Sequence, residues 1–128
     1  FQSNKCNSYV PYRSSYELKF FFMLDLDSKV KSYEVETLKI PYRDYNGTNR
    51  NYVPDVIVLY KTGRIEVCEV KPNAMLDDTT VKLKAKACED YFNLLFKDSS
   101  IKYSYRFVTE TDLFENSSDY ALFLKDNN

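Results

Sequence analysis

Two apolar runs separated by a short polar turn stand at the centre of the sequence. Val56 to Tyr60 and Ile65 to Val70 are almost continuously apolar, and Lys61-Thr62-Gly63 lies between them. Runs of this length with a glycine-containing turn predict a β-hairpin. Because apolar residues occupy both faces of each strand, we expect the hairpin to lie inside a sheet that is covered on both sides.

A helix is predicted on each side of this hairpin in the sequence. Ser14 and Glu17 match the S-x-x-E capping box ahead of an apolar run that reaches about Asp25. A second helix is predicted from Val81 to Phe96, after a cap at Asp77, Asp78 or Thr79. Its apolar seam recurs at intervals of three or four residues, which is typical of a helix packed on a sheet. The seam consists of Val81, Ala85, Cys88, Phe92 and Leu95.

Further strands are predicted before and after the central hairpin. Residues Val30 to Tyr42 read as one strand that stops near Pro41, and a polar turn follows at Tyr45 to Asn49. This strand and the first strand of the central hairpin should form a second hairpin with a long polar tip. Ile101 to Thr109 alternates with period two, and a short helix is expected within Thr111 to Leu124. The resulting α-β-β-β-α-β order predicts an α/β fold with a mixed sheet flanked by helices.

Composition limits the chain to one domain. Its 128 residues are 44% hydrophobic, and we expect a single domain at residues 5–128 after a tag remnant at residues 1–4. No apolar run is long enough for a membrane span, and no signal peptide is visible, so we expect a cytoplasmic protein. The three cysteines form no C-x-x-C pair, which predicts reduced thiols.

The chain contains no histidine, and this excludes several classes of hydrolase. Ser-His-Asp and Cys-His enzymes and nucleases with histidine metal ligands all require that side chain. Any chemistry must use carboxylates, lysine, tyrosine or serine. The net charge of −1 gives no global basic field, so nucleic-acid binding would need a local basic patch or a partner protein.

The candidate chemistry lies at the end of the central hairpin that is distant from its turn. Asp55 opens the first strand, while Glu69 and Lys71 share one face at the end of the second. A two-residue turn would place Asp55 opposite Val70. A three-residue turn that ends in Gly63 as a bulge would instead pair Asp55 with Glu69, so this turn is the one we predict.

Two carboxylates beside a lysine suit metal-dependent phosphodiester hydrolysis. Carboxylate oxygens are preferred ligands of Mg²⁺, which binds phosphate and activates water. A structural alternative explains the same residues as an exposed Glu69–Lys71 ion pair, with Asp55 as a turn residue after Pro54. Glu17 likewise has a capping explanation, in which its carboxylate accepts the backbone N–H of Ser14.

The ordered motifs resemble the PD-(D/E)XK nuclease superfamily, with Pro54-Asp55 and Glu69-Val70-Lys71 as its motif. More closely, residues 12 to 113 resemble the N-terminal catalytic domain of TnsA-type transposon endonucleases. The motifs that carry this likeness are S-x-x-E at 14–17, the aspartate-rich stretch at 25–27, I-P-Y at 40–42, Y-x-P-D at 52–55, E-V-K-P at 69–72 and V-T-E at 108–110. The run Y-R-S-x-x-E-x-x-F-F-F at 12–22 is also similar to the head-completion nuclease of T-even phages.

The resemblance implies a restriction-endonuclease-like αβββαβ core and assigns roles to individual residues. Glu17, Asp55 and Glu69 would be the acidic groups of the metal site, the backbone carbonyl of Val70 a further ligand, and Lys71 the catalytic lysine. The implied cofactor is Mg²⁺, with Mn²⁺ able to substitute. The residues expected to contact DNA are Lys84, Arg13 and Lys82.

These expectations combine into a leading hypothesis of a Mg²⁺-dependent DNA endonuclease. The resemblance implies a second, C-terminal domain for partner contact, which this sequence does not contain. This counts against a transposition role, and we expect a stand-alone nuclease, a phage-type nuclease or a shortened piece of a longer protein. The expected partners are DNA and a transposase or phage assembly protein, in the bacterial cytoplasm or a virion. The alternatives are a non-cleaving module that binds DNA or protein, and a phage head-completion or assembly protein.

Overall fold

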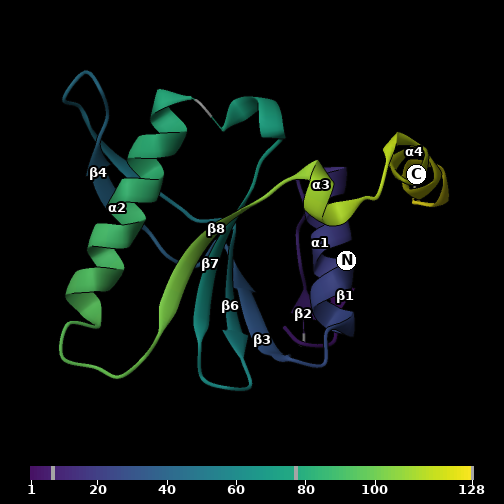
Figure 1. Ribbon diagram of the computed structural model, residues 1–128, viewed down its shortest axis with the longest axis horizontal. Helices are drawn as coiled ribbons and strands as arrows, with labels where there is room; N and C mark the ends of the chain where they lie inside the picture. Colours follow the sequence, from purple (N-terminus) through teal and green to yellow (C-terminus); the bar gives the residue numbers. More distant parts are fainter. Residues whose placement is uncertain (7, 77, 128) are drawn as a thin grey trace.

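A four-stranded mixed sheet forms the centre of the computed structural model, which describes residues 1–6, 8–76 and 78–127 (Figure 1). Its strand order is β3-β6-β7-β8, in which β3, β6 and β7 are antiparallel neighbours and β8 runs parallel to β7. The strands are β3 (Val30–Val35), β6 (Val56–Tyr60), β7 (Ile65–Val70) and β8 (Tyr103–Val108). The predicted mixed sheet and the restriction-endonuclease-like fold class are therefore confirmed.

Helices cover both faces of this sheet, as predicted (Figure 1). One face carries α1 with the short pair β1–β2, and α3 and α4 follow β8 on that side; the other face carries α2 and the separate β4–β5 hairpin. The elements are β1 (Gln2–Ser3), β2 (Ser8–Tyr9), α1 (Ser15–Leu26), β4 (Ile40–Arg43), β5 (Asn49–Tyr52), the 3-10 turn η1 (Asn73–Met75), α2 (Thr79–Leu95), α3 (Glu110–Leu113) and α4 (Ser117–Asp126). None of the described helices is long and apolar enough to cross a membrane.

Alternate residues of the central strands supply two separate cores. Val56 and Cys68 are paired in register, and both pack on the α1 side of the sheet. Val67 points the opposite way, toward Cys88 of α2 and Ile40 of β4. This alternation follows from the period of two in a strand, and it confirms that both faces of the hairpin are covered.

The turn between β6 and β7 has the predicted three-residue form. The N–H of Tyr60 donates to the carbonyl of Arg64 at 2.9 Å, so Lys61, Thr62 and Gly63 form the loop. Gly63 has φ 92°, in the region that favours glycine, and its N–H donates to the carbonyl of Tyr60 at 2.9 Å. Register therefore continues as predicted toward the far end of the hairpin.

The predicted single strand from residue 30 to 42 is wrong, because the chain breaks near Glu36. This residue has φ 56°, which turns the backbone out of the sheet, and its N–H donates to the carbonyl of Asp55 at 3.2 Å. β3 ends before the break and pairs with β6 as expected. The polar tip is itself a hairpin, in which Pro41 of β4 lies opposite Asn51 of β5.

Helix α2 follows the predicted seam except at its last turn. Val81, Cys88 and Phe92 are buried, but Leu95 is 56% exposed, so its predicted place in the core is wrong. The ring of Phe96 at the helix end takes that place, 5.6 Å from the ring of Phe92.

The N-terminal cap of α2 is Asp78, whose carboxylate accepts the N–H groups of Thr80 and Val81 at 2.8 and 3.3 Å. Of the three caps predicted from the sequence, Thr79 is the first helical residue, and Asp77 lies outside the described residues.

The N-terminal residues that sequence reasoning set aside are part of the packed structure. Ser3 is fully buried and its hydroxyl donates to Asp25 at 2.8 Å while it accepts from the Tyr33 hydroxyl at 2.7 Å. The ring of Phe1 packs edge-on against Phe22 of α1 at 4.7 Å. Whatever their origin, these residues close one side of the α1 core.

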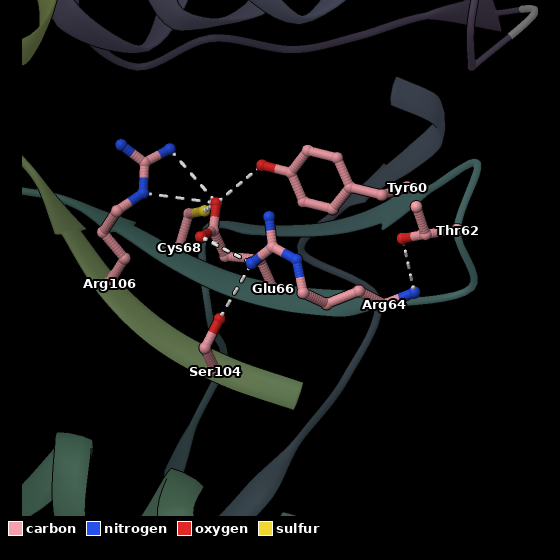
Figure 2. Close-up of polar contacts among 7 residues, drawn as sticks. All are labelled: Tyr60, Thr62, Arg64, Glu66, Cys68, Ser104 and Arg106. Carbon is pink, nitrogen blue, oxygen red and sulfur yellow. Dashed lines mark hydrogen bonds and ion pairs between the residues drawn. The ribbon is translucent and has the colours of Figure 1, made fainter. Parts of the chain in front are cut away.

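A buried carboxylate near the β6–β7 turn is surrounded by donors (Figure 2). Glu66 of β7 is 6% exposed and accepts from the Tyr60 hydroxyl at 2.9 Å and from Arg106 Nε at 3.2 Å. Arg64 lies 3.5 Å from its second oxygen, and the Cys68 thiol lies 3.5 Å from its first. Burial alone would raise the pKa of Glu66, but attraction to Arg106 and these hydrogen bonds outweigh it and lower the pKa.

Candidate active site

Asp55 and Glu69 meet at the end of the sheet opposite the Glu66 cluster. The pair Val56↔Cys68 is the last in the β6–β7 ladder, and the next step of the register places Asp55 opposite Glu69. The N–H of Asp55 donates to Glu69 Oε2 at 3.4 Å, and the N–H of Val70 donates to Asp55 Oδ2 at 2.8 Å. The pairing predicted from Gly63 is therefore confirmed.

Two tyrosines hold the Glu69 carboxylate in place. Glu69 is 5% exposed, and the Tyr52 hydroxyl donates to its Oε2 at 2.5 Å. Because this bond uses the only hydroxyl proton of Tyr52, the Tyr105 hydroxyl at 2.8 Å must donate to Tyr52. Burial and the charge of Glu69 raise the pKa of Tyr52 far above its ordinary value, so Tyr52 remains a donor.

Sequence reasoning did not assign a role to either tyrosine. Tyr52 had a usable signal, since it opens the Y-x-P-D motif three residues before Asp55 and closes strand β5. Tyr105 had none, because its position depends on the parallel pairing of β8 with β7, where it lies beside Val67.

Lys71 lies next to Glu69, as its strand position predicted. Its ammonium Nζ is 3.5 Å from Glu69 Oε1, and its side chain remains 25% exposed. The backbone N–H of Lys71 donates to the carbonyl of Val108 at 3.0 Å, and Pro72 follows. The ammonium group is thus held beside the two carboxylates with access to solvent.

The carboxylates of this site are only partly neutralised. Burial raises the pKa of Asp55 to about 7, and repulsion from Glu69 adds to the effect. The N–H of Val70 and the charge of Lys71 oppose this rise without cancelling it. A cation that approached Asp55 and Glu69 would relieve their repulsion.

Glu17 caps α1 only in part, so its capping interpretation needs correction. Its N–H donates to the Ser14 hydroxyl at 3.2 Å, which is one half of a capping box. Its carboxylate accepts from the N–H of Arg13 at 3.2 Å, whereas the box requires the N–H of Ser14. Burial raises the pKa of Glu17, and the charges of Glu36 and Glu69 raise it further. The side chain therefore faces the same acidic surroundings as Asp55.

Glu36 is a further acid near the site that sequence reasoning missed. Arg13 forms a bidentate ion pair with it, from Nε to Oε1 and from Nη2 to Oε2, both at 2.9 Å. The backbone N–H of Glu36 also donates to the carbonyl of Asp55. Because Arg13 is engaged in this way, its expected contact with DNA would compete with an ion pair.

The three lysines of α2 differ in their relation to the site. Lys84 Nζ lies 5.6 Å from the ring centroid of Tyr52, so it borders the tyrosine that binds Glu69. Lys82 is exposed, and Lys86 pairs with Asp90 at 2.8 Å. Lys84 is thus the α2 lysine nearest to the predicted chemistry, while roles in DNA binding for Lys84 and Lys82 stay predictions.

The donors present fit one hard cation held by two carboxylates. Across residues 1–6, 8–76 and 78–127, no three acidic or cysteine side chains are grouped closely enough to hold a metal ion. Asp55 and Glu69 nevertheless supply the oxygen ligands that Mg²⁺ prefers, and Mg²⁺ often keeps several waters while binding one or two carboxylates. Glu17 does not complete a three-acid group in this arrangement.

Comparison with known proteins identifies the family of this fold. The family model described as TnsA-like endonuclease N terminal matches residues 27–110, more than half of the chain. The matched segment contains Asp55, Glu69 and Lys71 but begins after Glu17. A search of curated proteins finds no match to the chain.

Proposed function

We propose that this chain, which belongs to the TnsA-like endonuclease N-terminal family, is a metal-dependent endonuclease that hydrolyses phosphodiester bonds in DNA. The observation that carries the proposal is the meeting of Asp55, Glu69 and Lys71 at one end of the hairpin, within the matched segment. Buried carboxylates that lack full compensation are characteristic of functional sites.

In this proposal Asp55 and Glu69 bind Mg²⁺ or Mn²⁺, with the backbone carbonyl of Val70 as a further ligand. A bound divalent ion would supply Lewis-acid stabilisation of phosphate charge and activation of the attacking water. The Tyr52 hydroxyl fixes one oxygen of Glu69, so Glu69 Oε1 and the Asp55 carboxylate are the groups that would hold such an ion. The N–H of Val70 orients Asp55 in the same way.

Lys71 acts on the phosphate in this scheme. Its ammonium lies beside Glu69 and remains partly exposed, so it reaches a phosphate oxygen placed near the carboxylates. There it stabilises the negative charge that develops in the transition state. Glu17 contributes negative charge from α1, and a small movement away from the N–H of Arg13 would free its carboxylate to orient water.

A non-cleaving module that binds DNA is the second candidate. It is favoured by the engagement of Glu17 with Arg13, which leaves the described part of the chain without a three-acid group. The net charge of −1 further suggests that a partner protein, a transposase or a phage assembly protein, brings the domain to its DNA.

Cleavage assays with matched variants separate these candidates. The protein is incubated with supercoiled, linear and branched DNA in Mg²⁺ or Mn²⁺, alongside Asp55→Ala and Lys71→Ala. Asp98→Ala and Lys97→Ala are the controls, since both residues are exposed in the α2–β8 connection. We expect cutting by the wild type and both controls only. Cutting that survives Asp55→Ala and Lys71→Ala would defeat the assigned site, and no cutting by the wild type would favour the binding module.

A further inference from the structure

The β4–β5 hairpin is a local basic element in a chain with a net charge of −1. Between Lys39 and Tyr52 the basic residues are Lys39, Arg43 and Arg50, against the single acid Asp44. Asp44 is already neutralised, because its Oδ2 binds Arg50 Nε at 2.8 Å. The hairpin therefore provides the local positive field that the composition of the whole chain lacks.

One face of the hairpin is anchored and the other is free. Ile40 and Tyr52 are opposite each other and buried against α2. Since residues alternate between faces, the pairs formed by Pro41 with Asn51 and by Arg43 with Asn49 lie on the other face. All four of these residues are exposed.

The tip of the hairpin is held rigid from within. Asp44 Oδ1 accepts the N–H groups of Asn46 and Thr48 at 2.9 and 3.0 Å, and Gly47 closes the turn with φ 79°. Arg50 is bound to Asp44 through Nε, and its terminal nitrogens form no hydrogen bond with the residues that the structure describes. The Arg43 side chain forms no ion pair with any residue that the structure describes. A preorganised ribbon with available guanidinium groups loses little entropy when it binds.

These side chains border an open groove of about 730 Å³. Its lining consists of hairpin residues alone, namely Pro41, Tyr42, Arg43, Asn49, Arg50 and Asn51. Arginine and asparagine are the side chains that pair with guanine and adenine edges, and arginine also binds phosphate. A two-stranded ribbon fits a major groove about 12 Å wide.

The position of the hairpin links it to the candidate active site. Strand β5 ends at Tyr52, whose hydroxyl binds Glu69, so Asn51 lies next to a residue of the site. Figure 1 shows the hairpin tip and η1, which follows Lys71 in the chain, along the upper edge of the view on either side of α2. A duplex bound at the base of the ribbon is thus one residue along the chain from Tyr52, which contacts Glu69.

We infer that the β4–β5 hairpin binds the duplex next to the scissile phosphate. Arg43, Asn49 and Asn51 of its free face contact a phosphate and the base edges, and Arg50, which pairs with Tyr42 on the opposite face, contacts a second phosphate. The inference rests on the proposed function, because it takes DNA as the ligand. It explains how a chain without net positive charge holds DNA at its own site.

Binding in EDTA tests this inference without cleavage. A short labelled duplex is titrated by fluorescence anisotropy at several salt concentrations with the wild type, Arg43→Ala/Arg50→Ala and Lys61→Ala/Lys102→Ala. The second double variant removes equal charge from exposed positions at the opposite end of the sheet. We expect the hairpin variant to bind about tenfold more weakly and its salt slope to fall by about 2, with the control close to wild type.

Further variants keep the test decisive if loss of the Asp44–Arg50 pair loosens the turn. Arg43→Ala alone should lower the salt slope by about 1, and Arg43→Lys should restore it. Equal losses in both double variants would show that only net charge matters and would overturn the inference, as would unchanged binding in the hairpin variants.

The two proposals fail separately. If the wild type cuts DNA in Mg²⁺ while the hairpin variants bind and cut like it, the hairpin assignment is wrong and the nuclease proposal stands. If the wild type cuts nothing but the hairpin variants lose binding, the hairpin assignment stands and hydrolysis is wrong.

Discussion

Strand β7 buries two glutamates three residues apart, and their surroundings differ sharply. Glu66 and Glu69 are 6% and 5% exposed, so both lose nearly all contact with water. Glu66 receives Arg106, Arg64 and the Tyr60 hydroxyl (Figure 2), and its pKa is lowered. Glu69 receives the Tyr52 hydroxyl and one ammonium at 3.5 Å, and it faces Asp55, whose pKa is raised to about 7.

The partners of the two carboxylates distinguish Glu66, which is structural, from Glu69, which is available for the proposed chemistry. A buried charge that is fully paired contributes to a stable sheet but has no capacity left for a ligand. Two buried acids that share one lysine lower the stability of the free protein. Binding of a cation would reduce the repulsion between them. The proposed chemistry therefore belongs to the Glu69 end of β7, whereas Glu66 at the other end pairs with Arg106, Arg64 and Tyr60.

The largest expected effect comes from the same substitution at the two positions. Glu66→Gln leaves Arg106 and Arg64 without a charged partner, so we expect the free energy of unfolding to fall by about 2 kcal/mol. Glu69→Gln keeps an acceptor for Tyr52 and removes a charge that repels Asp55, so we expect no loss. Urea unfolding without metal measures both. Equal losses would contradict the contrast between the two ends.

A second prediction uses the cation itself. Millimolar Mg²⁺ or Mn²⁺ should stabilise the wild type by about 1.4 kcal/mol at ten times the dissociation constant, because it binds only the folded site. Asp55→Asn should lose this gain, whereas Glu66→Gln should keep it despite its lower starting stability. Thermal unfolding with and without metal gives the shifts. An undiminished gain in Asp55→Asn would place the cation elsewhere.

The Glu69 end of this contrast was predictable from local sequence, whereas the Glu66 cluster was not predicted. Gly63 and the run lengths beside it determine the turn, and the turn determines that Asp55 lies opposite Glu69. Apolar periodicity identified α2 and the two covered faces of the hairpin. These features depend on residues close together in the chain, where turn chemistry and periodicity act directly.

Other features depend on packing between distant segments and gave no local signal. The break at Glu36 occurs at a residue with no preference for positive φ, and its backbone bond to Asp55 supports it. Tyr105 reaches Tyr52 only because β8 crosses over and pairs in parallel with β7. The Glu17 carboxylate accepts the N–H of Arg13 rather than that of Ser14, and this depends on the path of the chain before α1.

A third prediction concerns pH. The pKa of Asp55 is about 7 in the folded protein and near 3.8 when unfolded, so between these values the folded state binds more protons. The free energy of unfolding of the metal-free protein should therefore fall as pH rises from 6 to 7, by about 1 kcal/mol relative to Asp55→Asn. Urea unfolding of both proteins across this range measures the difference. Parallel curves would show that Asp55 is ionised throughout.

The smallest expected effect tests whether Glu69 has a second cation nearby, as Glu66 does. Lys84 lies 5.6 Å from the Tyr52 ring centroid, where a cation–π contact is worth about 0.5 kcal/mol, so Lys84→Gln should lower stability by no more than that. Its loss should slow DNA cleavage roughly threefold because positive charge beside the site is removed. Lys86→Gln, on the exposed side of α2 where Lys86 pairs with Asp90, is the matched variant and should cut at the wild-type rate. Equal slowing in both variants would assign the effect to the general positive charge of α2. Lys71 would then act at Glu69 without a contribution from Lys84.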